Sequence, residues 1–187
     1  MYSMNNNITF GARFIQKIPI KTYSFEKKIY TPDTANFVEF MPADSKDICV
    51  LGDIAQDFGG DSFANNVYIH AKYFRNNEAS RARFFGLTKQ NSDYENLNPN
   101  NVLGVCEITK KSEHTNEIEY LQVHPRFVYP CGPRPIKRIG TAILDCIKEF
   151  SNQITLRASY NSGKFYKKND FTEINPEKRL YLWTKEN

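Results

Sequence analysis

Two stretches of the chain show the spacing of apolar side chains that is typical of an amphipathic helix. The first lies within residues 45–58 and is followed by Gly59-Gly60, a pair that predicts a helix end. The second begins near residue 139 and is the most regular in the sequence; its apolar positions are Ile139, Ala142, Ile143, Cys146, Ile147 and Phe150. We expect a third, less periodic helix over residues 62–74.

Short runs of β-branched and aromatic residues predict strands between these helices. Alternating polar and apolar positions over residues 7–30 predict strands or a β-hairpin. Further strands are expected at 35–42, 82–87, 103–108, 116–123 and 153–159, and in a closing pair formed by FTEI and RLYLWT, with a short helix at NSGKFYKKN. The mixture of strands and helices, without an internal repeat, predicts an α/β or α+β fold.

Composition and charge exclude several classes of protein. Hydrophobic residues make up 40% of the chain and charged residues 25%, as in ordinary folded proteins. The net charge of +4 favours anionic ligands without the excess that nucleic-acid-binding proteins carry. Since no run of ~20 apolar residues and no secretory signal is present, we expect a cytoplasmic protein without a membrane partner. The four cysteines lack the spacing of a metal site, and we expect no bound metal.

A basic segment precedes the most regular helix. No acidic residue lies between Tyr120 and Leu144, whereas Arg126, Arg134, Lys137 and Arg138 do. Main-chain N–H groups in the first turn of a helix attract anions, and the missing Cβ of Gly140 would let a phosphate approach the backbone. These features predict a phosphate site, although a solvated basic loop at a helix start accounts for them equally well.

The same segment, VHPRFVYPCGPRPIKRIGTAIL, resembles the acetyl-CoA-binding core of the GNAT superfamily of N-acetyltransferases. The family's motif places Gln or Arg, two residues, Gly, one residue and then Gly or Ala after a strand that ends in an apolar-x-Pro phrase. Lys137, Gly140 and Ala142 occupy these places. The phrase SYNSGKFYKKNDF is similar to a second family motif, with Ser159 for its Asn and Tyr166 in register.

The resemblance implies an acyl-CoA N-acyltransferase fold over residues 35–187, after a β-rich N-terminal arm at 1–34. Such a fold has a mixed, mostly antiparallel sheet of about six to seven strands and about four helices. It also implies acetyl-CoA as cofactor and direct acetyl transfer to a primary amine of a small molecule or a protein. The cofactor-binding residues it implies are Leu121, Gln122, Val123, Lys137, Arg138, Ile139, Gly140, Thr141, Ala142 and Ser159, with the main chain of Leu121 and Val123 on a splayed strand.

Such a transfer needs a proton acceptor and a proton donor. A lysine-like amine with a pKa near ~10.4 must lose a proton before it attacks a thioester. Glu117 is the first candidate base, with Glu119 or a water molecule as alternatives; strict alternation would put both carboxylates on one face with Leu121 and Val123. The resemblance implies Tyr166 as the general acid for the departing thiolate.

Other classes of function stay open at this point. A non-catalytic GNAT-fold protein that binds coenzyme A or a macromolecular partner is the main alternative. Lysines and aromatic residues interleave in the arm, as they do in proteins that bind single-stranded nucleic acid. Lysines on edge strands also prevent aggregation, and we favour this second interpretation. Cys131 is a candidate acyl carrier, and Asp53, Asp57 and Asp61 could favour a cationic acceptor. The sequence leaves homodimer formation open.

Overall fold

The computed structural model describes residues 11–75, 81–89, 97–128 and 132–186. Cys131 and the first ten residues of the arm lie outside them. In chain order the elements are β1 (Arg13–Ser24), β2 (Ile29–Phe40), α1 (Ser45–Asp57), α2 (Phe63–Phe74), β3 (Ala82–Thr88), a 3₁₀ turn (Pro99–Asn101), β4 (Val102–Lys110), β5 (Thr115–Val123), α3 (Pro125–Val128), β6 (Ile136–Lys137), α4 (Ile139–Glu149), β7 (Gln153–Arg157), α5 (Gly163–Lys168), β8 (Thr172–Asn175) and β9 (Leu180–Thr184).

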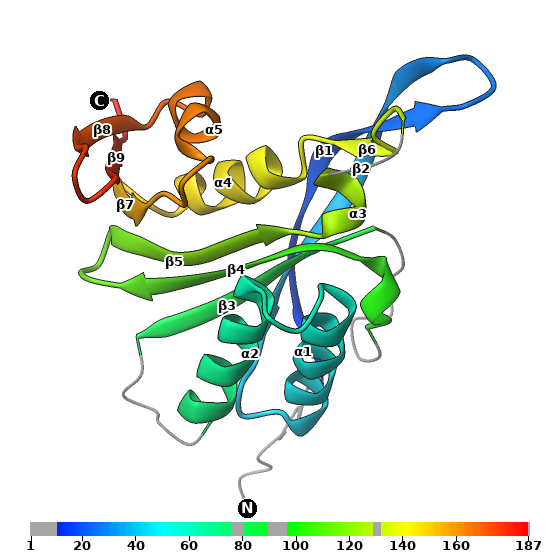
Figure 1. Cartoon of the computed structure of the whole chain (residues 1–187). Coiled ribbons are helices and arrows are strands. Elements are labelled where there is room, and N and C mark those ends of the chain that lie inside the picture. The colour runs from blue at the N-terminus through cyan, green and yellow to red at the C-terminus, as the bar shows by residue number, and fades with distance from the viewer. Residues whose placement is uncertain (1–10, 76–80, 90–96, 129–131, 187) are drawn as a thin grey trace, which may run out of the picture.

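The strands form one mixed sheet in the order β6-β1-β2-β3-β4-β5-β7-β9-β8. Neighbouring strands are antiparallel except β5 and β7, which run parallel. Helices α1 and α2 cover one face, and α4 and α5 cover the other (Figure 1). The predicted mixed α/β class with a mostly antiparallel sheet is confirmed, although the sheet has more strands than the sequence predicts.

The helix α1 begins and ends as its sequence predicts. Asp44 is its N-cap and accepts a hydrogen bond from the Lys46 N–H at 2.8 Å. At the other end Gly59 and Gly60 take positive φ angles of 105° and 69°, and the Gly60 N–H donates to the Ala55 carbonyl. Glycine adopts such angles without a steric penalty, so this pair ends the helix cleanly.

The helix α4 lies where the strongest apolar stripe predicts a helix. Its stripe, from Ile139 through Ala142, Ile143 and Cys146 to Ile147, is buried against the sheet. Burying such side chains gives roughly 1.5–3 kcal/mol each for the large ones. This burial fixes the start of α4 beside the strands β4 and β5, and it thereby positions the basic segment.

The N-terminal hairpin is part of the same sheet. β1 pairs with β2 over its whole length, and β2 pairs with β3 from Asn36 onward. The domain boundary predicted at residue 34 falls inside β2, and the division into arm and domain stays a prediction. β1 also pairs with the two-residue strand β6, through Lys21 with Lys137 and Thr22 with Ile136. The sequence does not indicate β6, because two residues carry no periodicity.

Helices within the described residues fall short of membrane-spanning length and apolarity.

Replacing Gly104 of β4 by alanine is expected to destabilise the fold. A Cβ there would lie 2.9 Å from the main-chain oxygen of Gln122 and 3.1 Å from Cδ1 of Ile143. Because a backbone atom cannot move aside cheaply, we expect a loss of about 1–3 kcal/mol in the free energy of unfolding. Urea denaturation measures it, with the exposed Lys110→Ala on the same strand as a control that changes little. Equal midpoints for both variants would contradict the close approach of β4 and β5.

Candidate functional site

The site is organised by the separation of β5 from β7. These strands pair only from Thr115 with Gln153 to Ile118 with Leu156, whereas β5 continues to Val123. Beyond Ile118, β5 keeps β4 as its partner on one edge. Figure 1 shows β5 running on beneath α4 past the end of β7.

The free edge of β5 carries main-chain groups of known orientation. The His124 N–H donates to the Leu103 carbonyl at 2.9 Å, toward β4. Successive residues of a strand point their N–H and C=O groups to opposite edges, so those of Val123 and Leu121 point away from β4. These are the two residues whose main chain the resemblance places on a splayed strand.

A β-bulge at Glu119 changes which face of β5 Glu117 occupies relative to Leu121 and Val123. Glu107 pairs with Tyr120 while the adjacent Ile108 pairs with Ile118, so Glu119 is an extra residue. The bulge shifts the alternation, and Ile118 and Leu121 both pack toward α4. The prediction that Glu117 shares a face with Leu121 and Val123 is therefore wrong, because strict alternation does not continue through a bulge.

Glu117 is paired with a lysine. The Lys111 Nζ lies 2.7 Å from Glu117 Oε2 and 3.8 Å from Glu119 Oε1. These carboxylates raise the pKa of Lys111, chiefly through its hydrogen bond to Glu117. Glu117 also lies within the stretch of β5 that is still paired with β7, opposite Thr155. Its role as a base stays a prediction.

The start of α4 leaves main-chain donors without helical partners. The first helical hydrogen bond runs from the Ala142 N–H to the Arg138 carbonyl at 2.7 Å, so the N–H groups of Ile139, Gly140 and Thr141 precede it. Arg138 is the N-cap with a φ of 70°, and no side chain caps the helix. This arrangement suits an anion such as a phosphate.

The arm holds the basic loop that leads into α4. The Tyr30 hydroxyl donates to the Arg134 carbonyl at 3.0 Å, and the Tyr23 N–H donates to the Pro135 carbonyl at 2.8 Å. The Lys137 Nζ lies 3.7 Å from the centroid of the Tyr30 ring. The other predicted cation, Arg138, lies 3.3 Å from Asp145 through its guanidinium. Both cations therefore have partners within the chain.

Gly140 has a different neighbour from the one that its sequence context suggests. A Cβ built on it would lie 2.9 Å from Cζ of Phe165 and 3.5 Å from Cγ2 of Val123. The side expected to admit a phosphate thus faces an aromatic ring of α5. Sequence spacing gives no sign of this contact, because Phe165 is brought there by the turn between β7 and α5.

Tyr166 lies in the core beneath the point where the strands part. Its side chain is buried against Phe165, Phe171 and Tyr181. Burial raises the pKa of Tyr166 well above its usual value. The phenol therefore keeps its proton at neutral pH. Ser159, by contrast, is exposed, and its hydroxyl donates to Ser162 Oγ at 2.9 Å.

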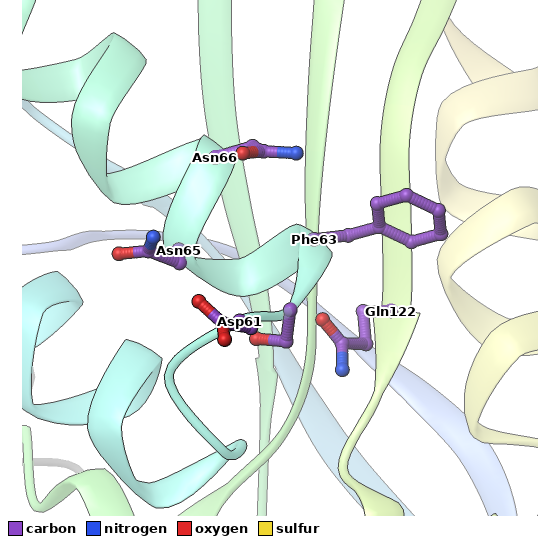
Figure 2. Close-up of a pocket in the computed structure, with 6 residues that line it drawn as sticks. Asp61, Phe63, Asn65, Asn66 and Gln122 are labelled. Carbon is purple, nitrogen blue, oxygen red and sulfur yellow. The ribbon is translucent and has the colours of Figure 1, made fainter.

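A pocket of about 510 Å³ lies on the opposite face, around the first turn of α2 (Figure 2). Gln122 reaches it from β5, and its Oε1 accepts a hydrogen bond from the Ala64 N–H at 2.7 Å. The carboxylate of Asp61 lines the pocket, whereas Asp57 is held by the His124 ring at 2.9 Å. We call this the α2 pocket; its lining residues are Asp61, Ser62, Phe63, Asn65, Asn66 and Gln122.

An acid–imidazole pair that the sequence does not predict lies on the same face. His70 of α2 lies with Nδ1 at 2.9 and 3.1 Å from the two carboxylate oxygens of Glu107. Glu107 is buried in β4, and burial raises its pKa to about 7, although the hydrogen bond to His70 opposes the shift. The signal that could have found it is the single acid within the apolar run VLGVCEI.

Comparison with known proteins identifies the fold. No family model and no curated protein matches the sequence. A solved structure from Desulfovibrio desulfuricans, assigned to the GNAT family of acetyltransferases, is similar with a TM-score of 0.57 at 10% identity, over 80% of this chain and 98% of that one. The N-acetyltransferase PseH of Campylobacter jejuni, solved in complex with acetyl coenzyme A, is similar with a TM-score of 0.51 at 13% identity, over 81% of this chain and 99% of that one. This chain therefore has the fold of the GNAT acetyltransferases, and the resemblance is confirmed at that level.

The contact between Gly140 and Phe165 is open to a double-mutant test. Gly140→Ala forces a Cβ against the ring, whereas a leucine at position 165 leaves room for it. We expect Gly140→Ala to cost less in a Phe165→Leu background, with a coupling of about 1 kcal/mol in the free energy of unfolding. Chemical denaturation of the four proteins measures this. Strictly additive effects would mean that the ring does not pack on the glycine.

Proposed function

We propose that this protein is an N-acetyltransferase that transfers an acetyl group from acetyl-CoA directly to a primary amine. The observation that carries the proposal is the free edge of β5 at Leu121 and Val123, which lies beside the uncapped first turn of α4. The fold that the chain shares with GNAT acetyltransferases supports it. A cytoplasmic location and an amine of either a small molecule or a protein remain parts of this proposal.

Main-chain groups of the site fit the cofactor. The N–H and C=O groups of Leu121 and Val123 would hold the amides of the pantetheine chain, because an extended chain can add to a free strand edge. The N–H groups of Ile139, Gly140 and Thr141 would hold the diphosphate, with Lys137 and Arg138 adding positive charge. Gln122, Ala142 and Ser159 stay predicted contacts. The Phe165 ring lies on the Cβ side of Gly140.

The cofactor supplies the acetyl thioester, and the chain supplies the proton transfers. Tyr166 keeps a proton that its phenol can donate to the departing thiolate. The α2 pocket, with the carboxylate of Asp61, offers the amine a route from the other face of the sheet. Glu117 is the base that the sequence predicts. Donor and acceptor thus act from opposite faces, at the point where β5 leaves β7.

Release of free thiol from acetyl-CoA tests the proposal. The purified protein is offered a peptide with a free N-terminus, a peptide with a free lysine, spermidine and ethanolamine, and we expect thiol release with at least one. Tyr166→Phe should reduce turnover on the order of 10²-fold, because it removes the proton and leaves the ring. Tyr181→Phe, a buried neighbour, is the control and should stay near wild type. Tight acetyl-CoA binding without turnover on any amine would support a non-catalytic binding protein instead.

The arm should contribute to cofactor affinity. Tyr30→Ala removes a hydrogen bond and a cation–π contact that hold the basic loop, and each is worth ~1 kcal/mol. We expect roughly a tenfold loss of affinity for coenzyme A in calorimetry. Phe25→Ala, at an exposed aromatic on the same hairpin, is the matched control and should bind as wild type. Equal affinities for both variants would contradict the role of the arm.

A further inference from the structure

The pair His70–Glu107 lies at the same level of the sheet as the predicted proton donor. Glu107 pairs with Tyr120, one residue beyond the bulge, and the preceding pair joins Cys106 to Leu121 on the free stretch of β5. Tyr166 and Cys106 both belong to the buried cluster on the α4 face of the sheet. Glu107 points to the other face, toward α2. The pair therefore stands across the sheet from the predicted acid.

His70 and Glu107 differ in solvent exposure, as expected if His70 exchanges a proton with a substrate and Glu107 holds the His70 ring. The side chain of Glu107 is 2% exposed, whereas that of His70 is 40% exposed. An ionised carboxylate can only accept hydrogen bonds, so Nδ1 of His70 carries the proton and Nε2 presents its lone pair. Among the described residues, Nε2 has no hydrogen-bond partner. A substrate on the α2 face could reach this nitrogen, but not the buried carboxylate.

Aromatic contacts connect the pair to the α2 pocket. The rings of Phe63, which lines the pocket, and Tyr120 lie 5.7 Å apart, and those of Tyr120 and His70 lie 5.5 Å apart. Phe63 points toward β5 in Figure 2. Tyr120 thus separates pocket from imidazole by the width of one ring. An amine that enters at Asp61 would pass along this aromatic surface.

We propose that His70 is the proton acceptor for the acceptor amine, and that Glu107 is the residue that positions it. The inference rests on the proposed acetyl transfer. The ammonium first passes one proton to Nε2 of His70, which releases it to solvent, and the neutral amine then attacks the thioester. As the C–N bond forms and the C–S bond breaks, the second proton of the nitrogen passes to Nε2 of His70, and Tyr166 gives its proton to the thiolate. His70 then releases this proton to solvent, and solvent returns one to Tyr166.

The pair predicts the direction of the pH dependence. The titratable groups around Glu107 are His70 from α2, Tyr120 and Glu119 from β5, and Cys106, its neighbour in β4, which points to the opposite face of the sheet. Burial raises the pKa of Glu107 to about 7, so the carboxylate form, which holds the Nδ1 proton in place, is gained as the pH rises through that value. We therefore expect kcat/KM to rise across this range. Glu107→Gln should change this limb of the profile, because the neutral amide no longer titrates beside the base.

The test compares His70→Ala with His114→Gln, using the amine from the panel that gives the fastest thiol release. His114 is an exposed histidine between β4 and β5 and serves as the control. We expect His70→Ala to lower kcat ~10²-fold with the affinity for acetyl-CoA unchanged, and added imidazole to restore turnover. His114→Gln should match wild type. Glu117→Gln in parallel separates the two candidate bases, and a greater loss there than in His70→Ala would overturn the inference.

The remaining outcomes separate a failure of the proposed function from a failure of the inference about His70. If wild type transfers acetyl to no amine, the proposed function fails and the inference with it. If wild type is active and His70→Ala is equally active, the inference alone is overturned. A loss in His70→Ala that imidazole does not restore, or that comes with weaker acetyl-CoA binding or a lower melting temperature, would show that His70 has a structural role only.

Discussion

The main-chain edge that β5 presents after it leaves β7 is the constraint on which the rest of this site depends. Buried backbone N–H and C=O groups need partners, and in a sheet the next strand supplies them. Beyond Ile118, within the part of the chain that the structure describes, β5 has such a partner only on its β4 side. The gap beside Leu121 and Val123 is kept open because β7 turns into α5, while the buried stripe of α4 holds the helix against β4 and β5. An extended ligand with amide groups is the natural occupant of such an edge.

The bulge at Glu119 determines which side chains of β5 lie on each face of the sheet next to this edge. By shifting the alternation it turns Leu121 toward α4 and Tyr120 toward α2, next to Glu107. The buried phenol of Tyr166 then lies on one side of the parting strands, and the pair His70–Glu107 lies on the other. In the proposed direct transfer the amine and the departing thiolate are different groups on the reacting carbon, so a proton acceptor on one face and a proton donor on the other would each serve one of them.

The N-terminal hairpin adds a support that the core of the fold does not contain. Its strand β1 pairs with β6, and the Tyr30 ring and hydroxyl hold the loop before α4. Lys137 and Arg138 thus belong to an ordered loop with partners in the chain. Contacts of this kind reduce the conformational freedom that a loop would lose on binding an anion, and they tie the hairpin to the predicted cofactor site.

The sequence by itself determined the features that depend on local periodicity and local chemistry. The stripe from Ile139 to Ile147 and the pair Gly59-Gly60 predicted α4 and the end of α1, since helix burial and left-handed turns leave a direct mark on neighbouring residues. The sheet class followed from the succession of short strands, and the basic segment pointed to the start of α4. Only the tertiary structure decided the bulge at Glu119, the ring of Phe165 against Gly140, and the meeting of His70 with Glu107. The bulge depends on the register of paired strands, and the two side-chain contacts depend on how helices pack against the sheet and against each other. Such contacts join residues as far apart as His70 and Glu107, 37 positions, and no local pattern encodes them.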